Sequence, residues 1–200
     1  MRLDKVIVRA VLSTLSAIFV LFGCMLLALC FLYPSTMMNI TYDLGMDKAS
    51  VKYATRAYKH TEEVYYIAFA TETAIGADLD EKIEECGLAF VKDSEFATYC
   101  AERDAKMGLG EGYAQYVYAQ VSLAQYRQGE KDEAINTAFS AIASNTFPKN
   151  NAVEGLALTA LMGGDKAVAD KIQEEMMNIE SGLSGEDKQN FDALLSLLEE

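Results

Sequence analysis

The 200-residue sequence has a single histidine, His60, and this scarcity excludes several kinds of catalytic site. Zinc sites of the H-E-x-x-H type and di-iron sites built from E-x-x-H pairs both need a second histidine. Adjacent acidic residues, such as Glu84 and Glu85, point about 100° apart on a helix and therefore do not converge on one ligand. The sequence predicts no catalytic residues, no metal site and no cofactor, so we do not expect an enzyme.

Proline and tryptophan are also scarce, with two prolines and no tryptophan. Alanine, leucine, glutamate, methionine and lysine, which favour helices, are abundant instead. No run alternates valine, isoleucine and threonine with polar residues, as a half-buried strand would. We therefore predict an all-α protein.

Residues 10–33 contain no charged side chain at all. A helix of this length reaches about 36 Å, at about 1.5 Å per residue, which is enough to cross a hydrocarbon core of about 30 Å. We predict that residues 10–33 form a transmembrane helix. The remaining chain then divides into an N-terminus over 1–9, a juxtamembrane linker over 34–46 and a helical domain over 47–200.

Two other interpretations of this apolar stretch fit its length and flanks less well. A secretory signal peptide has an apolar region of about 7–15 residues and a small-x-small cleavage site, and no such site follows Tyr33. The residues before Cys24 resemble a lipoprotein signal, but Phe22 is bulky and further apolar residues follow. We favour an uncleaved anchor in which Cys24 is a small apolar residue.

The distribution of charge predicts the orientation of the chain. Arg2, Lys5 and Arg9 precede the apolar stretch, whereas no Lys or Arg follows it until Lys48. Positive charge is retained on the cytoplasmic side of a membrane, so we predict a single-pass protein of the cell membrane with a cytoplasmic N-terminus and an extracytoplasmic C-terminal domain. Residues 10–200 contain 14 Lys and Arg and 29 Asp and Glu, a balance that repels nucleic acid and anionic lipid headgroups.

The sequence of the C-terminal domain predicts a series of short helices, because apolar residues recur at helical spacing between capping residues and glycines. Thr61 and Asp78 are the expected caps of the second and third helices. The expected helices cover residues 47–59, 62–76, 79–91, 95–107, 113–128, 134–142, 152–162, 166–181 and 184 onward. The helix over 113–128 is apolar on two sides, which predicts that it lies between neighbours or lines a groove.

Two glycines that close predicted helices, Gly129 and Gly164, lie 35 residues apart, and Ala134 and Ala169 follow each at the same distance. This pattern resembles the tetratricopeptide repeat, a helix–turn–helix unit of about 34 residues. The residues of 115–148 that match this family are Tyr118, Val121, Gly129, Ala134 and Ala141, and those of 150–183 are Leu156, Ala157, Gly164 and Ala169. The resemblance implies an α-solenoid of helical hairpins.

The same resemblance implies a groove that binds partner proteins. In the tetratricopeptide register, the residues that face this groove are Tyr116, Leu123, Tyr126 and Arg127. Five of the 11 tyrosines fall between Tyr99 and Tyr126, and tyrosine is enriched at binding surfaces. The alternative is that these tyrosines pack between helices.

Together these features predict a membrane-anchored helical-repeat protein that mediates protein–protein interactions as a scaffold or accessory subunit of a membrane or envelope complex. Protein partners are expected, with no nucleic acid. The alternative function is an extracytoplasmic domain that binds a solute or polysaccharide through the aromatic groove.

Cys86 and Cys100 are the two cysteines of the C-terminal domain, and each lies seven residues from Asp93. If Asp93 marks the tip of an antiparallel helical hairpin, the two side chains face each other at a separation that a disulfide can bridge. An extracytoplasmic location would permit oxidation. The alternative is two buried thiols that act as small apolar residues.

The predicted orientation can be tested by protease protection in intact cells or right-side-out vesicles. Added protease is expected to digest the chain beyond about residue 45, because that part is extracytoplasmic, and to spare the first nine residues. Mass spectrometry of the protected peptides is the measurement. A C-terminal domain that resists digestion until the membrane is broken would contradict the orientation.

Overall fold

The computed structural model of the chain describes residues 2–108, 112–141, 152–179 and 185–199. These residues form eleven α-helices and no strand, so the predicted all-α class is confirmed. The chain divides into two compact units, Met1–Glu62 and Glu63–Glu200. The predicted helix end at Ile142 and the predicted start at Ser184 lie outside the described residues.

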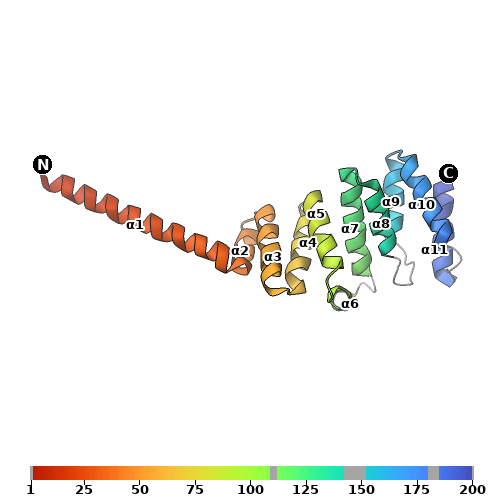
Figure 1. The fold of residues 1–200 in the computed structure, drawn as a ribbon, viewed down its shortest axis with the longest axis horizontal. Helices are drawn as coiled ribbons and strands as arrows, with labels where there is room; N and C mark the ends of the chain where they lie inside the picture. The colour runs from red at the N-terminus through yellow and green to blue at the C-terminus, as the bar shows by residue number, and fades with distance from the viewer. Residues whose placement is uncertain (1, 109–111, 142–151, 180–184, 200) are drawn as a thin grey trace. The chain divides into compact units, whose positions relative to one another are not determined.

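The first unit contains α1 (Arg2–Leu32), α2 (Pro34–Asp43) and α3 (Asp47–Thr61) (Figure 1). By length and composition, α1 is suited to cross a membrane over Val6–Leu32, and most side chains of this stretch are exposed. Most of the predicted linker over 34–46 is helical, because Pro34 starts a helix at the turn where its missing N–H costs no bond. α2 packs on α3, with Met38 buried and its carbonyl accepting a hydrogen bond from the Ser50 hydroxyl at 3.2 Å.

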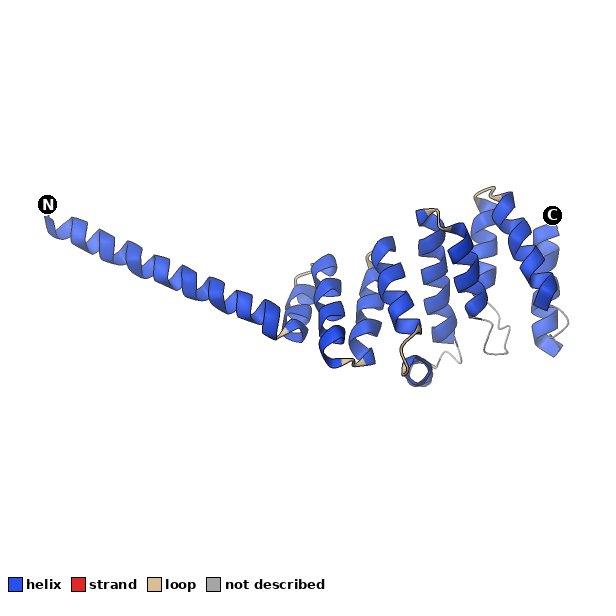
Figure 2. Ribbon diagram, in the orientation of Figure 1, coloured by secondary structure: helices blue, strands red, loops and turns tan. Residues whose placement is uncertain are grey.

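The second unit contains eight described helices. They are α4 (Val64–Gly76), α5 (Asp80–Val91), α6 (Phe96–Met107), α7 (Gly112–Gln128), α8 (Lys131–Ser140), α9 (Ala152–Met162), α10 (Lys166–Ile179) and α11 (Gly185–Glu199). Most of them pack side by side in chain order, whereas α6 crosses its neighbours and is seen end-on in Figure 2.

Four helical hairpins, α2/α3, α4/α5, α7/α8 and α9/α10, are closed by the same backbone turn. Each turn has one residue with positive φ, whose N–H bonds to the carbonyl three residues earlier, and the next N–H bonds to the carbonyl five earlier. The positive-φ residues are Gly45 (67°), Asp78 (49°), Gly129 (88°) and Gly164 (69°). Three of these are glycines because the left-handed conformation is strained for other residues.

These turns recur at a nearly constant spacing, except where α6 intervenes. The first two are 33 residues apart and the last two are 35 apart. The interval from Asp78 to Gly129 is 51 residues and contains the whole of α6. Therefore α6 is an additional helix between the second hairpin and the third.

The predicted two-sided helix, α7, does lie between neighbours. It packs against α5 on one side and against α8 and α9 on the other, and α6 also contacts it. The approach to α5 is close at Gly87, where a Cβ atom would lie 2.2 Å from Val121 Cγ2. Beyond α7, the C-terminal core buries apolar residues of α8 to α11, among them Leu156, Ile172 and Phe191.

Two predicted caps are wrong. Thr61 is the last residue of α3, and its hydroxyl donates to the Ala57 carbonyl at 3.1 Å instead of capping α4. Asp78 lies in the left-handed turn, so Leu79 precedes α5. In both places a helix ends at a positive-φ residue, Glu62 or Asp78, and neither position is a glycine that would mark it in the sequence.

The contact between Gly87 and Val121 predicts that Gly87→Ala destabilises the second unit. Valine is rigid about χ1 and cannot move aside without shifting α7, so we expect a loss of about 1–3 kcal/mol. Gly155→Ala is the matched control. It places a methyl group where no atom lies within 4 Å, and it should stabilise α9 by about 0.5–1 kcal/mol.

Thermal unfolding of the detergent-solubilised proteins, followed by circular dichroism, compares the two variants. The double variant Gly87→Ala/Val121→Ala removes the clash and should recover part of the loss. Equal melting temperatures for Gly87→Ala and Gly155→Ala would contradict the close packing of α5 on α7.

Candidate partner-binding surface

The four predicted groove residues lie on α7 but differ in their surroundings. Tyr116 is 45% exposed. Leu123 and Tyr126 are half-buried against the core of α8 to α11. The Tyr126 hydroxyl also donates to Asp165 Oδ2 at 3.2 Å, which ties α7 to the turn before α10.

Arg127, the fourth residue, forms an ion pair with Asp80 at the start of α5. Its Nε lies 2.9 Å from Asp80 Oδ1 and 3.1 Å from Oδ2, and its Nη2 lies 2.5 Å from Oδ1. The Asp80 carboxylate raises the pKa of Arg127. The structure therefore leaves Tyr116 as the predicted residue whose ring is most open to a partner.

Tyr116 belongs to a group of aromatic rings where α7 meets α6. Its ring centroid is 6.4 Å from that of Tyr113, which is in turn 6.4 Å from that of Tyr99 on α6. We call Tyr99, Tyr113 and Tyr116 the tyrosine cluster. A second set of edge-on contacts joins Phe96 of α6 to Phe90 of α5 and to Tyr118 of α7.

The tyrosine cluster surrounds a charged pair, Glu72 of α4 and Arg103 of α6. Arg103 Nη2 lies 3.0 Å from Glu72 Oε1, and the Tyr113 hydroxyl donates to the same oxygen at 2.5 Å. The guanidinium carbon is 5.7 Å from the centre of the Tyr113 ring. Burial and the Glu72 carboxylate both raise the pKa of Tyr113, so its hydroxyl stays a donor at any physiological pH.

The charged groups of this arrangement are held by one another. Glu72 forms an ion pair with Arg103 and accepts a hydrogen bond from the Tyr113 hydroxyl. What remains on the surface is the amphipathic ring of Tyr116, which offers apolar area with a polar tip. In the sequence, the number of tyrosines was the reason to expect a binding surface. Nothing in the sequence indicated the pairing of Glu72 with Arg103.

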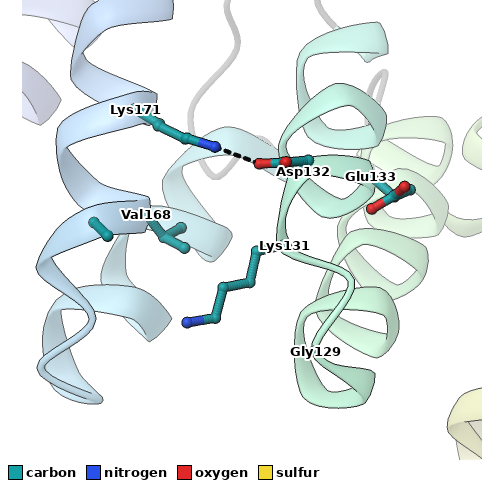
Figure 3. Close-up of a pocket in the computed structure, with 7 residues that line it drawn as sticks. Gly129, Lys131, Asp132, Glu133, Val168 and Lys171 are labelled. Carbon is teal, nitrogen blue, oxygen red and sulfur yellow. Dashed lines mark hydrogen bonds and ion pairs between the residues drawn. The ribbon is translucent and has the colours of Figure 1, made fainter.

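A cavity of about 360 Å³ lies between the start of α8 and the start of α10. Figure 3 shows Lys131, Asp132, Glu133 and Lys171 around it. Both lysines are already paired: Lys171 Nζ lies 2.5 Å from Asp132 Oδ1, and Lys131 Nζ lies 2.6 Å from Asp165 Oδ2. Because both lysines are held by carboxylates of the protein, neither is an unpaired cation for an anionic ligand.

Cys86 lies on α5 and Cys100 on α6, and both are buried thiols. The antiparallel hairpin on which the disulfide prediction depends is wrong, because α5 packs between α4 and α7 while α6 crosses them. The Phe90 ring, 4.8 Å from that of Phe96 and 5.5 Å from that of Tyr99, occupies the contact between α5 and α6. The disulfide itself stays a prediction, now without its geometric basis.

Comparison of the sequence with known protein-family models gave no match, and comparisons with curated proteins and with solved structures gave none either. The class that the structure itself defines is an all-helical protein with an N-terminal helix suited to cross a membrane.

Burial raises the pKa of the Cys100 thiol to about 12, with a smaller contribution from Asp104. The reactive thiolate is therefore rare, and at pH 8 we expect Cys100 to alkylate about 1,000-fold more slowly in the native protein than after unfolding. Because the folded pKa is raised, its rate should keep rising with pH well above pH 9. Mass spectrometry after timed iodoacetamide treatment measures this, and Cys86–Cys100 linked peptides would show that the disulfide forms instead.

Proposed function

We propose that this chain is a single-pass membrane protein whose helical hairpins form a tetratricopeptide-like α-solenoid that binds partner proteins. Its role is that of a scaffold or accessory subunit of a membrane or envelope complex. In this proposal residues 10–33 are the anchor, the N-terminus is cytoplasmic and the C-terminal domain is extracytoplasmic.

The observation that carries the proposal is the repeated hairpin turn. Four turns share one pattern of backbone hydrogen bonds, and the intervals of 33 and 35 residues agree with a unit of about 34 residues. The packing also agrees with a repeat array, since α7 contacts its own hairpin partner α8 and the first helix of the next hairpin, α9. Repeat arrays present extended surfaces to partners, and this part of the argument is by analogy of fold.

The anchor is supported by α1, whose apolar side chains are exposed over most of its length. Soluble monomers rarely expose apolar patches larger than a few hundred Å², so a helix of this kind needs a lipid or protein environment. The scarcity of Lys and Arg just after it, compared with Arg2, Lys5 and Arg9 before it, supports the orientation.

Tyr116 is the residue that best tests partner binding. Affinity purification of the full chain from native membranes in mild detergent should recover a stoichiometric protein partner. Tyr116→Ala should weaken that recovery at least tenfold while changing the melting temperature little, because the ring is 45% exposed. Tyr126→Ala is the control for stability, and it should lower the melting temperature because it removes a ring packed on the core and a hydrogen bond to Asp165.

Two results would contradict this proposal. If both variants melt far below the wild type, the tyrosines are packing residues. If the purified chain retains a glycan or small solute and no protein, the alternative function, a solute- or polysaccharide-binding domain, is favoured instead.

A further inference from the structure

The exposed face of α3 carries a row of basic side chains. Lys48, Lys52, Arg56 and Lys59 follow one another at intervals of four, four and three residues, so they lie on one face of the helix. The opposite face buries Ser50, Val51, Ala54 and Ala57. We call these four basic residues the α3 basic face.

This row is unusual in so acidic a chain. Residues 34–62 contain four Lys and Arg, all of them on the α3 basic face, and three acidic residues. Residues 63–200 contain ten Lys and Arg and 26 Asp and Glu. After α1, basic residues therefore outnumber acidic ones only over the α2/α3 hairpin, whereas acidic residues predominate in the rest of the chain.

Within the described residues, the three lysines of the α3 basic face have no acidic partner. Lys48, Lys52 and Lys59 are exposed, and the ion pairs of the described residues do not include them. Like charges spaced four residues apart repel each other and weaken a helix. Their arrangement therefore costs stability in the isolated chain, and an anionic surface would remove this cost.

Contacts within the first unit place this face beside the end of α1. The Arg56 guanidinium carbon is 4.5 Å from the centre of the Phe31 ring, and the Tyr53 hydroxyl donates to Cys30 Sγ at 3.1 Å. Figure 1 shows α2 and α3 crossing the direction of α1 steeply. If α1 follows the bilayer normal, α3 lies along the membrane surface at the depth of the headgroups.

The α2/α3 hairpin also exposes apolar side chains. Ile40 of α2 and Leu44 and Met46 of the following turn are exposed. A polar face rich in lysine and arginine combined with exposed apolar residues is typical of helices that lie in the membrane interface.

We propose that the α3 basic face binds anionic phospholipid headgroups of the membrane in which α1 is anchored. This inference rests on the proposed membrane anchor. The acidic second unit is repelled by the same headgroups, so the α2/α3 hairpin would be the part of the chain that stays on the membrane surface.

Lysine footprinting of the full chain in lipid nanodiscs tests this directly. An amine-reactive acetylating reagent is applied in discs of phosphatidylcholine alone and in discs with 40% phosphatidylglycerol. We expect Lys48, Lys52 and Lys59 to react at least fivefold more slowly in the anionic discs, and the difference to disappear in about 0.5 M salt because of screening. Lys92 and Lys106, which are exposed in the second unit, serve as internal controls and should react equally in both discs.

A matched pair of triple variants supplies the second measurement. Lys48→Gln/Lys52→Gln/Lys59→Gln and Lys92→Gln/Lys106→Gln/Lys166→Gln change the net charge equally. Extracted from mixed vesicles in limiting detergent, the wild type and the second variant should retain at least twice as much phosphatidylglycerol as the first.

Equal footprinting in the two discs, or equal lipid retention by the two variants, would overturn the proposal. Protection of the three lysines in both discs at every salt concentration would also overturn it, and would indicate a protein covering the face. Flotation of the chain with vesicles separates this result from failure of the anchor: a chain that floats but does not select lipid overturns only the headgroup site, whereas a chain that does not float overturns the anchor and this proposal together.

Discussion

The structure depends on a turn in which one left-handed residue folds the first helix of each hairpin back onto the second. All eight helices of the four hairpins have only 10–17 residues, and helices so short are marginal in water unless their apolar face is covered. The turns at Gly45, Asp78, Gly129 and Gly164 pack the next helix of the chain against this apolar face. The paired helices then leave a second apolar side, which is why α7 is buried by α5 on one side and by α8 and α9 on the other.

The additional helix α6 interrupts this regular packing and partly buries several polar groups. Where α6 crosses α4 and α7, the Glu72 carboxylate accepts the Arg103 Nη2 and Tyr113 hydroxyl donors, and the Asp104 carboxylate accepts the Tyr113 N–H at 2.9 Å. Each of these groups would be costly if it were buried without its partner. Among the described residues, the buried Arg103 Nε has no hydrogen-bond partner. Tyr116, the residue on which the proposed partner binding depends, lies at the border of this network. The proposed contact surface is therefore next to the additional helix α6.

The two units differ in the surroundings to which they are adapted. The first unit exposes apolar side chains along α1 and positive charge along α3, both of which suit a bilayer and its headgroups. The second unit is strongly acidic and has the buried apolar cores of a water-facing domain. This division is the basis of the proposal that the first unit holds the protein to a membrane and the second unit binds partners.

The sequence by itself determined the helical class, the apolar N-terminal helix and most helix positions, because these depend on local composition and on apolar spacing within one helix. It also identified α7 as a helix with neighbours on two sides. The tertiary structure alone decided the rest. Whether Tyr126 faces a groove or a core, and whether Cys86 faces Cys100, depends on the angle at which helices cross. The pairing of Glu72 with Arg103 likewise joins two segments that are distant in the chain, and no periodicity within one segment records such a contact.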